Sequence, residues 1–269
     1  MYNSSLFFKN TDEFKQWVSI QNYCQNHLNH IKSYFSRTLD SRQFNTPLEL
    51  QAYIFSLANG TANSLNTARV YLKYLEQTEK LPLEIITKYR KVLKIVKSRK
   101  DFFVPDNEAV LLNYNKIKRN AALELVYLVL ATSGIRYGEC LKFLKTFQID
   151  KFTINGNIAY YNVSELRNTK NINNIYLPLF VYNKLKTVNN TYNGLRQRYK
   201  EKECTFSLKY LRKWHYNFML YNNVPESVAD FIQGRANKSI SANHYLSRAQ
   251  QAAFWYGKIV KELEKVVKS

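Results

Sequence analysis

The octapeptide TSGIRYGE at residues 132–139 is the most informative local pattern in the chain. It follows an apolar run from Ala121 to Thr132, which predicts a buried helix. Gly134 is suited to end that helix, and a second helix is expected directly after it. Arg136 is then held at a tight turn, where Glu139 can fix the arginine or cap the new helix. Taken alone, the pattern also fits an ordinary helix–helix corner with a surface arginine.

Two more basic patterns and one tyrosine follow in order. Lys209 and Arg212 lie three residues apart in a predicted helix, so they share a face and can point at one target. Gly234 and Arg235 follow the next predicted helix, and Tyr245 comes ten residues after Arg235. The chain holds 21 tyrosines, so one tyrosine is by default a packing or surface residue, and only its spacing singles it out. The alternative tyrosines, for which we expect packing roles, are Tyr216, Tyr221 and Tyr256.

The spacing of these residues resembles the tyrosine recombinase (phage integrase) family. The residues that carry the resemblance are Arg136, Lys209, Arg212, Gly234, Arg235 and Tyr245. The resemblance covers about residues 105–250. It implies a mainly α chain with a small β-sheet, in which a helical core-binding domain precedes a tyrosine-recombinase catalytic domain with the DNA breaking-rejoining fold.

The resemblance also implies a reaction in which Tyr245 attacks a DNA phosphate and forms a 3′-phosphotyrosine link. Arg136 and Arg212 would each present a planar fork of N–H donors to that phosphate. Family members hold a lysine on a β-hairpin between the two arginine motifs. Lys170 fits this position and is expected to be the general acid for the departing 5′ oxygen, with Arg167 as the nearby competitor.

Two departures from the common family pattern are informative. Most members have histidine where this chain has Lys209, and histidine again where it has Arg235. Both replacements resemble the integrases of archaeal viruses and plasmids, including those of the spindle-shaped viruses, and indicate a mobile element of an archaeon. Arg235 would hold a phosphate oxygen or the tyrosine, and Lys209 would add positive charge or share in proton transfer.

The composition predicts a polyanionic partner. The net charge is +20, and 45% of the residues are hydrophobic, which is enough for real cores. Residues 1–100 carry 15 Lys and Arg against 7 Asp and Glu, and the remaining residues carry 25 against 13. Both halves are therefore basic, as expected if both bind one DNA duplex. The alternatives are a generally basic surface or a membrane surface, and no single amphipathic segment holds enough charge to favour a membrane.

The first hundred residues are predicted to be helical. Helices are expected after Thr11, after Thr46-Pro47, over 64–77 and over 82–100. The last of these carries seven lysines and arginines, which fit either a solvated face or a contact with the DNA backbone. Pro105 and its neighbours break the helical pattern. We therefore expect a helical core-binding domain over 1–103 and a catalytic domain over 104–269.

The second part is predicted to be mixed. Residues 152–163 alternate around Asn155-Gly156, a strong hairpin signal, and 175–177 are a further short strand. Residues 249–269 are expected to form a helix that contacts a neighbouring subunit, with packing into its own domain as the alternative.

Several other features limit the function. The three cysteines are far apart and form no C-x-x-C pair, so neither a disulfide framework nor a zinc site is expected. We expect no cofactor and no metal ion, because arginines supply the charge stabilisation. No signal peptide is recognised, and the most apolar run is too short to span a bilayer. A cytoplasmic location at the host nucleoid is expected.

These observations predict a site-specific recombinase that acts as a homotetramer on synapsed double-stranded DNA attachment sites, integrating or excising a viral or plasmid genome. One alternative is a type IB topoisomerase-like enzyme. A second is a non-catalytic DNA-binding regulator on a recombinase fold, against which the full set of cations argues. A third is a metal-dependent nuclease, for which the sequence offers no cluster of carboxylates.

Overall fold

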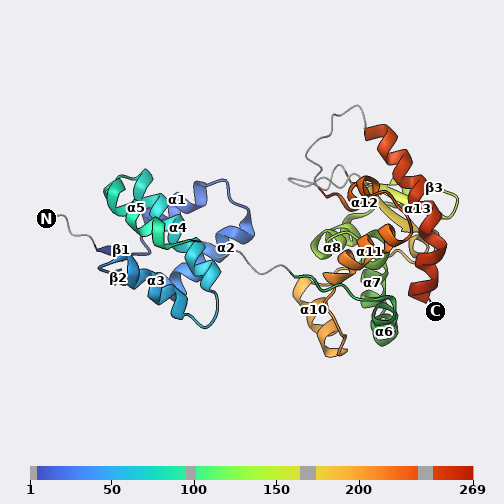
Figure 1. The fold of residues 1–269 in the computed structure, drawn as a ribbon, viewed down its shortest axis with the longest axis horizontal. Helices are drawn as coiled ribbons and strands as arrows, with labels where there is room; N and C mark the ends of the chain where they lie inside the picture. The colour runs from blue at the N-terminus through green and yellow to red at the C-terminus, as the bar shows by residue number, and fades with distance from the viewer. Residues whose placement is uncertain (1–4, 95–100, 164–173, 236–244, 269) are drawn as a thin grey trace. The chain divides into compact units, whose positions relative to one another are not determined.

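The computed structural model describes residues 5–94, 101–163, 174–235 and 245–268. The chain forms two compact units, Met1–Lys100 and Asp101–Ser269 (Figure 1). Residues 101–103, which the sequence grouped with the first domain, belong to the second unit. Lys213 donates hydrogen bonds to the carbonyl oxygens of Asp101 and Phe103, and the ring of Phe103 packs edge-on against Tyr210.

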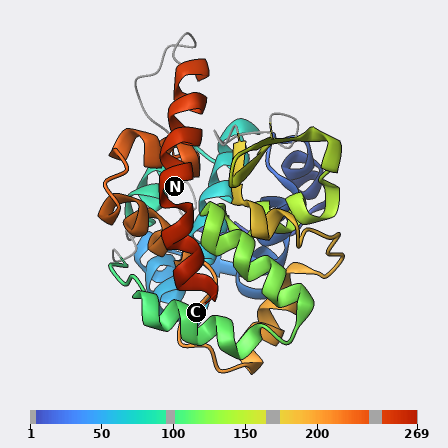
Figure 2. The same ribbon diagram turned by 90° about the vertical axis from the view of Figure 1, so that its right-hand side faces the viewer.

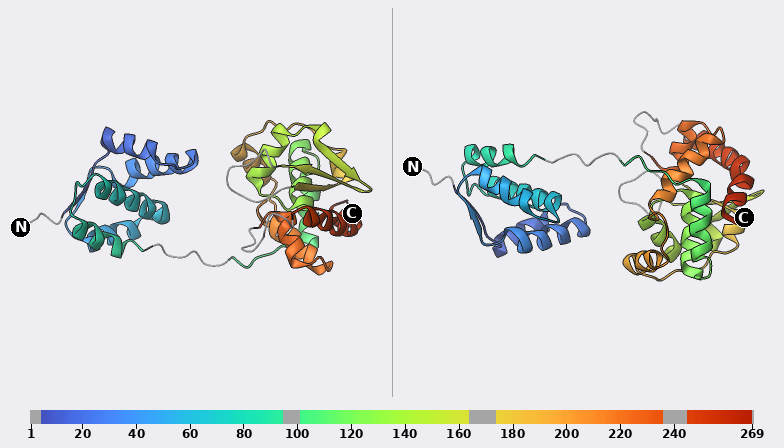
Figure 3. Two further views of the ribbon diagram at one scale, coloured as in Figure 1. Left: turned by 90° about the horizontal axis from the view of Figure 1, so that it is seen from above. Right: turned by 60° about the horizontal axis from the view of Figure 1, so that its bottom comes forward.

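The first unit is helical around a central helix, α4. Its elements are β1 Leu6–Phe8, α1 Asp12–Ile20, α2 Gln25–Tyr34, the π-helix η1 Phe35–Leu39, β2 Arg42–Phe44, α3 Pro47–Ser56, α4 Thr61–Gln77 and α5 Leu83–Val92. Helices α1, α2, α3 and α5 all pack against α4, as Figure 3 shows. Helices α1 and α3 begin after the expected residues, and both are capped by a side chain: Thr11 Oγ1 accepts from the Phe14 N–H and Thr46 Oγ1 from the Glu49 N–H.

Helix α5 is shorter than the sequence predicted, because it ends at Val92 and not at Lys100. Its last carbonyl groups bond to other helices of the unit: Gln51 Nε2 donates to Val92 O at 3.0 Å, and Arg69 Nη1 to Leu93 O at 2.7 Å. These tertiary bonds take the place of a further helical turn. The sequence predicted a longer helix because its apolar periodicity continues beyond Val92. Two of the basic residues on α5 are engaged, since Arg90 pairs with Glu76 and Lys88 with Glu84.

The second unit combines eight helices among its described residues with one small sheet and a 3₁₀ turn. Its elements are α6 Asn107–Ile117, α7 Ala121–Ser133, α8 Tyr137–Thr146, η2 Ile149–Lys151, β3 Phe152–Asn155, β4 Ile158–Asn162, β5 Asn174–Pro178, α9 Leu179–Tyr182, α10 Tyr192–Glu201, α11 Tyr210–Tyr221, α12 Glu226–Gln233 and α13 Tyr245–Lys268. Strand β4 is central and antiparallel to both neighbours, and Asn155 pairs with Ile158 across the predicted Gly156 turn. The predicted mainly helical chain with a small sheet is confirmed.

Helix α7 is the centre of this unit's core. Residues 125–133 are all buried, and α7 packs against α6, α8, α11, α13 and β5. Helix α13 extends from α12 to α6 across the unit, as Figure 2 shows. Its buried face is Ala252, Tyr256, Ile259, Val260, Leu263 and Val267. The apolar stripe of the C-terminal helix therefore completes its own domain's core, the alternative to the predicted contact with a neighbouring subunit.

Candidate active site

Arg136 lies at a turn built by Gly134. Helix α7 ends there because Gly134 adopts a left-handed conformation (φ 64°), and Arg136 is the extended residue that precedes α8. Glu139 fulfils both expected roles. Its Oε2 accepts from the Arg136 backbone N–H at 3.1 Å, and its Oε1 accepts from Arg136 Nη1 at 2.9 Å. The guanidinium is thereby held beside the start of α8.

Arg212 lies in the first turn of α11 and reaches the same turn. Its Nη1 donates to the carbonyl oxygen of Gly134 at 2.7 Å. Burial, followed by the positive charges of Arg136 and Arg235, lowers the pKa of Arg212 to about 10. The side chain therefore remains a cation at neutral pH. Arg212 thus bonds to Gly134, two residues before Arg136, and its carbonyl oxygen shares the Gln233 amide with Arg235. We call Arg136, Arg212 and Arg235 the arginine cluster.

Arg235 follows the left-handed Gly234 (φ 60°) that ends α12. Its backbone N–H donates to Asp230 O at 2.9 Å, as in the Schellman motif at a helix C-terminus. Its Nε donates to Gln233 Oε1 at 3.1 Å, and its guanidinium lies 3.6 Å above the centroid of the Tyr216 ring. The Tyr216 hydroxyl lies 3.0 Å from Asp230 Oδ1. Arg235 is thus fixed from its backbone, its Nε and one face of its plane.

The arginine cluster keeps donors for a ligand. Each guanidinium has five N–H donors, and the bonds described above use one on each side chain. The three side chains are only partly exposed, so a phosphate bound by them would be shielded from water.

Lys209 does not join the arginine cluster in this structure. Its Nζ lies 3.5 Å from Asp101 Oδ2, and its ammonium lies over the ring of Tyr210. Hydrogen bonding to Tyr210, and then to Asp101, raises the pKa of Lys209, which holds it protonated. The side chain is 67% exposed, so its ion pair with Asp101 is screened by water and easily exchanged. The shared target expected for Lys209 and Arg212 is absent from the described contacts.

The remaining predicted residues lie at or beyond the limits of the described structure. Tyr245 is the first residue of α13, but its side chain lies outside the described residues. Lys170 and its competitor Arg167 fall in 164–173, also outside them. Helix α13 packs near the arginine cluster. The Tyr256 hydroxyl donates to the carbonyl oxygen of Thr132 at 2.8 Å, and Thr132 lies two residues before Gly134.

Two buried residues that were not among the predicted site residues lie beside the arginine cluster. Gln233 directly precedes Gly234 and is buried, and His215 lies one turn after Arg212 and is also buried. Gln233 Nε2 lies 2.9 Å from Arg212 O and 3.1 Å from His215 Nδ1. Only the position of Gln233 beside Gly234-Arg235 could have drawn attention to it. Arg248, three residues after Tyr245 in α13, was also not predicted as a site residue. Its Nη1 is buried without a hydrogen-bond partner among the described residues.

Gly134→Ala is expected to lower the free energy of unfolding of the second unit by about 2–5 kcal/mol. A left-handed non-glycine residue costs about 1–2 kcal/mol, and overpacking adds about 1–3 kcal/mol. The added Cβ would collide with Gln233 Nε2 and His215 Nδ1. Urea unfolding followed by fluorescence measures the loss. Gly138→Ala is the matched control, because Gly138 lies in α8 with open space around its Cβ, and it should be neutral or slightly stabilising.

His215 is expected to make the second unit less stable in mild acid. Burial, followed by the charge of Arg212, lowers the pKa of His215 to about 3; the backbone of Thr132 opposes this shift in part without satisfying Nε2. Between pH 3 and 6.5 the unfolded chain therefore binds one more proton than the folded chain, and stability falls as the pH falls through the unfolded value. Lowering the pH from about 7.5 to about 5.5 should remove about 1.4 kcal/mol through this residue.

The matched variant for this prediction is His215→Asn, which offers a neutral acceptor near the position of Nδ1. Urea unfolding at both pH values should give a smaller loss of stability for this variant than for the wild type. An equal loss in both proteins would show that His215 is not the titrating group.

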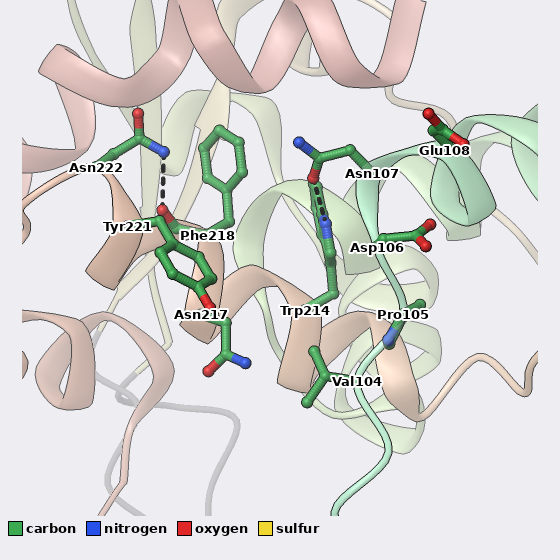
Figure 4. A pocket seen from close by; sticks show the side chains of 10 residues that line it. All are labelled: Val104, Pro105, Asp106, Asn107, Glu108, Trp214, Asn217, Phe218, Tyr221 and Asn222. Atoms are coloured by element: carbon green, nitrogen blue, oxygen red, sulfur yellow. Dashed lines mark hydrogen bonds between the residues drawn. The ribbon is translucent and has the colours of Figure 1, made fainter.

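Two hollows flank α11 and differ in charge. One, of about 680 Å³, lies where residues 104–108 meet the side of α11 (Figure 4). Asp106 and Glu108 line it, and none of the described residues around it is a lysine or arginine. The other, of about 1020 Å³, lies between α10 and the start of α11, and its lining includes Arg196, Lys200 and Lys209. Only the second has the charge to accept a nucleic acid.

Comparison with known proteins agrees with this geometry. The sequence model of the archaeal phage integrases matches residues 102–262, which contain every residue of the arginine cluster and Tyr245. The chain belongs to the archaeal phage integrase family. It is a tyrosine recombinase, an enzyme of site-specific DNA recombination. No curated protein sequence matches it.

Two solved structures support the fold of this integrase. A lambda integrase tetramer bound to a Holliday junction is 11% identical, with 86% of this chain and 78% of that one covered at a TM-score of 0.59. A lambda integrase dimer bound to a COC′ core site is 12% identical, with 90% and 75% covered at 0.59. The expected fold of a tyrosine recombinase is therefore confirmed.

Two further observations concern only the described part of the integrase. Within it, no helix combines the length and apolar character needed to cross a membrane. Nor do the described residues include three or more His, Cys, Asp or Glu grouped so that they could hold a metal ion.

Proposed function

We propose that Tyr245 is the nucleophile of this integrase and that the arginine cluster binds the scissile phosphate. The Tyr245 oxygen attacks phosphorus, a P–O bond to tyrosine forms, and the P–O5′ bond breaks. The supporting observation is that Arg136, Arg212 and Arg235 come from three separate segments, meet around the Gly134 turn and couple electrostatically, in the unit whose helix α13 begins with Tyr245.

The two proton transfers need donors and acceptors at opposite ends of the reacting bond. The departing 5′ oxygen takes a proton from Lys170, and the tyrosine proton passes to water or to a neighbouring basic group. An ordinary tyrosine has a pKa of about 10, so its phenol is protonated at neutral pH. Positive charge around the phenol favours the ionised form that attacks. The 3′-phosphotyrosine conserves the bond energy, so that the 5′ hydroxyl of a second strand can reverse the reaction.

Lys209 adds a cation at the edge of this site. Its exposed ion pair with Asp101 is weak and can be exchanged for a DNA phosphate. Because Lys209 is held protonated, it acts as a cation or a proton donor and not as a base.

The substrate and the assembly follow from the same chemistry. The helical first unit, Met1–Lys100, is the core-binding domain, and it binds duplex DNA together with the catalytic domain. The active form is a homotetramer on synapsed attachment sites, as expected for staged exchange between two duplexes. The purpose is integration or excision of an archaeal virus or plasmid genome, in the cytoplasm at the host nucleoid.

Covalent trapping tests this proposal. The protein, in a chelator, is mixed with a pool of nicked duplexes of randomised sequence, in which a cleaved strand loses its short 5′-hydroxyl fragment. We expect a subset of sequences to become covalently attached through their 3′ ends, and these define the site-bearing duplex for further work. Tight binding of DNA without any attached strand would instead support a non-catalytic DNA-binding protein.

Transfer of the attached strand to a second duplex separates the remaining alternative. A recombinase joins the trapped 3′ end to an added strand with a 5′ hydroxyl from another duplex. A topoisomerase would instead relax supercoiled DNA without preferring the selected sequence.

A further inference from the structure

The Gln233 side chain hydrogen-bonds to two members of the arginine cluster. Its Oε1 accepts from Arg235 Nε at 3.1 Å, and its Nε2 donates to the backbone oxygen of Arg212 at 2.9 Å. The amide is fully buried at the end of α12, directly before the left-handed Gly234. It therefore joins the two segments that carry Arg212 and Arg235.

The direction in which the amide faces is fixed by its partners. Arg235 Nε can only donate a hydrogen bond, and the Arg212 carbonyl can only accept one. These two constraints place Oε1 toward Arg235 and Nε2 toward Arg212. The second proton on Nε2 then points at His215 Nδ1, 3.1 Å away. His215 Nδ1 must accept this bond, so the proton of the neutral imidazole is on Nε2.

This tautomer gives His215 a buried Nε2–H group. That group is buried and has no hydrogen-bond partner among the described residues. A buried donor without an acceptor is unfavourable and requires an explanation. The hydrogen bond that Nδ1 accepts from Gln233 explains why the proton lies on Nε2. Gln233 cannot flip to suit the other tautomer, because a flipped amide would turn its NH₂ group against Arg235 Nε and its oxygen against the Arg212 carbonyl.

We propose that Gln233 and His215 form a positioning pair for the recombination reaction. Gln233 holds Arg212 and Arg235 in register for the same phosphate, and neutral His215 sets the direction of the Gln233 amide. Neither residue touches the DNA in this arrangement. The inference rests on the proposed function, since it matters only if these arginines bind the scissile phosphate.

The first test separates binding from cleavage for Gln233→Met, which keeps the length of the side chain and removes its hydrogen bonds. On the site-bearing nicked duplex, we expect the rate of adduct formation at saturating protein to fall about 10- to 100-fold. The dissociation constant for the same duplex should change less than about threefold, because most of the affinity comes from other phosphate contacts.

Asn113→Leu is the matched control. Asn113 is also a buried amide in the catalytic unit, where it bonds to Tyr199 and Thr205 and not to the arginine cluster. Its loss should destabilise the unit without slowing cleavage at a temperature where the protein is folded. If Gln233→Met cleaves at the wild-type rate, or no more slowly than Asn113→Leu, the positioning role is wrong. If the wild type itself forms no adduct, the proposed function fails instead.

His215 provides a test by rescue. His215→Asn keeps an acceptor for Gln233 Nε2, whereas His215→Leu removes it. We expect His215→Asn to retain most of the cleavage rate and His215→Leu to lose about as much as Gln233→Met. Combining His215→Leu with Gln233→Met should then slow cleavage no further. Additive losses in the double variant would contradict a shared role.

A measurement on the unaltered protein covers the case in which the variants do not fold. The ¹⁵N chemical shifts of the labelled histidine rings report the tautomer and its titration. We expect one histidine to remain neutral with its proton on Nε2 down to mildly acidic pH. A spectrum in which every histidine titrates near its ordinary pKa, or in which the buried ring carries its proton on Nδ1, would overturn the proposal.

Discussion

Tyr245→Phe is expected to abolish the covalent protein–DNA adduct while leaving duplex binding within about threefold of the wild type. Phenylalanine keeps the ring at the start of α13 but removes the only atom that could form the phosphate ester. Most of the affinity for a duplex comes from lysines and arginines against the backbone, and the chain carries 40 of them. The measurement is adduct formation on the site-bearing nicked duplex, beside the dissociation constant for the same duplex.

Tyr221→Phe is the control for this variant. Tyr221 is 85% exposed at the end of α11, so DNA can reach its hydroxyl group. Its replacement should leave adduct formation unchanged. Adduct formation by Tyr245→Phe at the wild-type rate would remove the proposed nucleophile, and loss with Tyr221→Phe would transfer the role to α11.

Arg212→Lys is expected to slow adduct formation by ~10²–10³-fold, the usual cost of removing a donor from a developing anion. Lysine keeps the positive charge but has one compact ammonium group. It cannot bond to Gly134 O and present a planar fork to the phosphate at the same time. Because the charge is conserved, the duplex affinity should change little, and the loss should appear in the cleavage rate.

Arg69→Lys is the matched control for this prediction. Arg69 also donates from Nη1 to a backbone carbonyl, that of Leu93, at the same 2.7 Å distance, but it lies in the first unit. This variant should cleave at the wild-type rate. Equal losses from the two replacements would mean that Arg212 only supports the fold.

The backbone around the arginine cluster was predictable from local signals. Gly134 and Gly234 end the helices that their positions indicated, and both adopt the left-handed conformation that glycine favours. The hairpin at Gly156 and the caps of α1 and α3 were equally local. In each case a residue type and its immediate neighbours determine the conformation, so one sequence suffices.

The features that were missed depend on distant contacts or on segments too short to show a pattern. The bond from Gln233 to Arg212 joins residues 21 positions apart, and no spacing rule predicts it. Lys209 hydrogen-bonds to Asp101, which lies 108 residues away in the sequence. Strands β1 and β2 have three residues each, which is too few to show alternation, and α5 ends where other helices bind its carbonyl groups.

The identity of the residue that carries the DNA tests the central claim most directly. The adduct of the unaltered protein with the site-bearing nicked duplex would be digested with protease and nuclease, and the nucleotide-bearing peptide would be sequenced by mass spectrometry. The account predicts a single modified residue, Tyr245, attached to a 3′ phosphate. A nucleotide attached to any other residue, or through a 5′ phosphate, would contradict it.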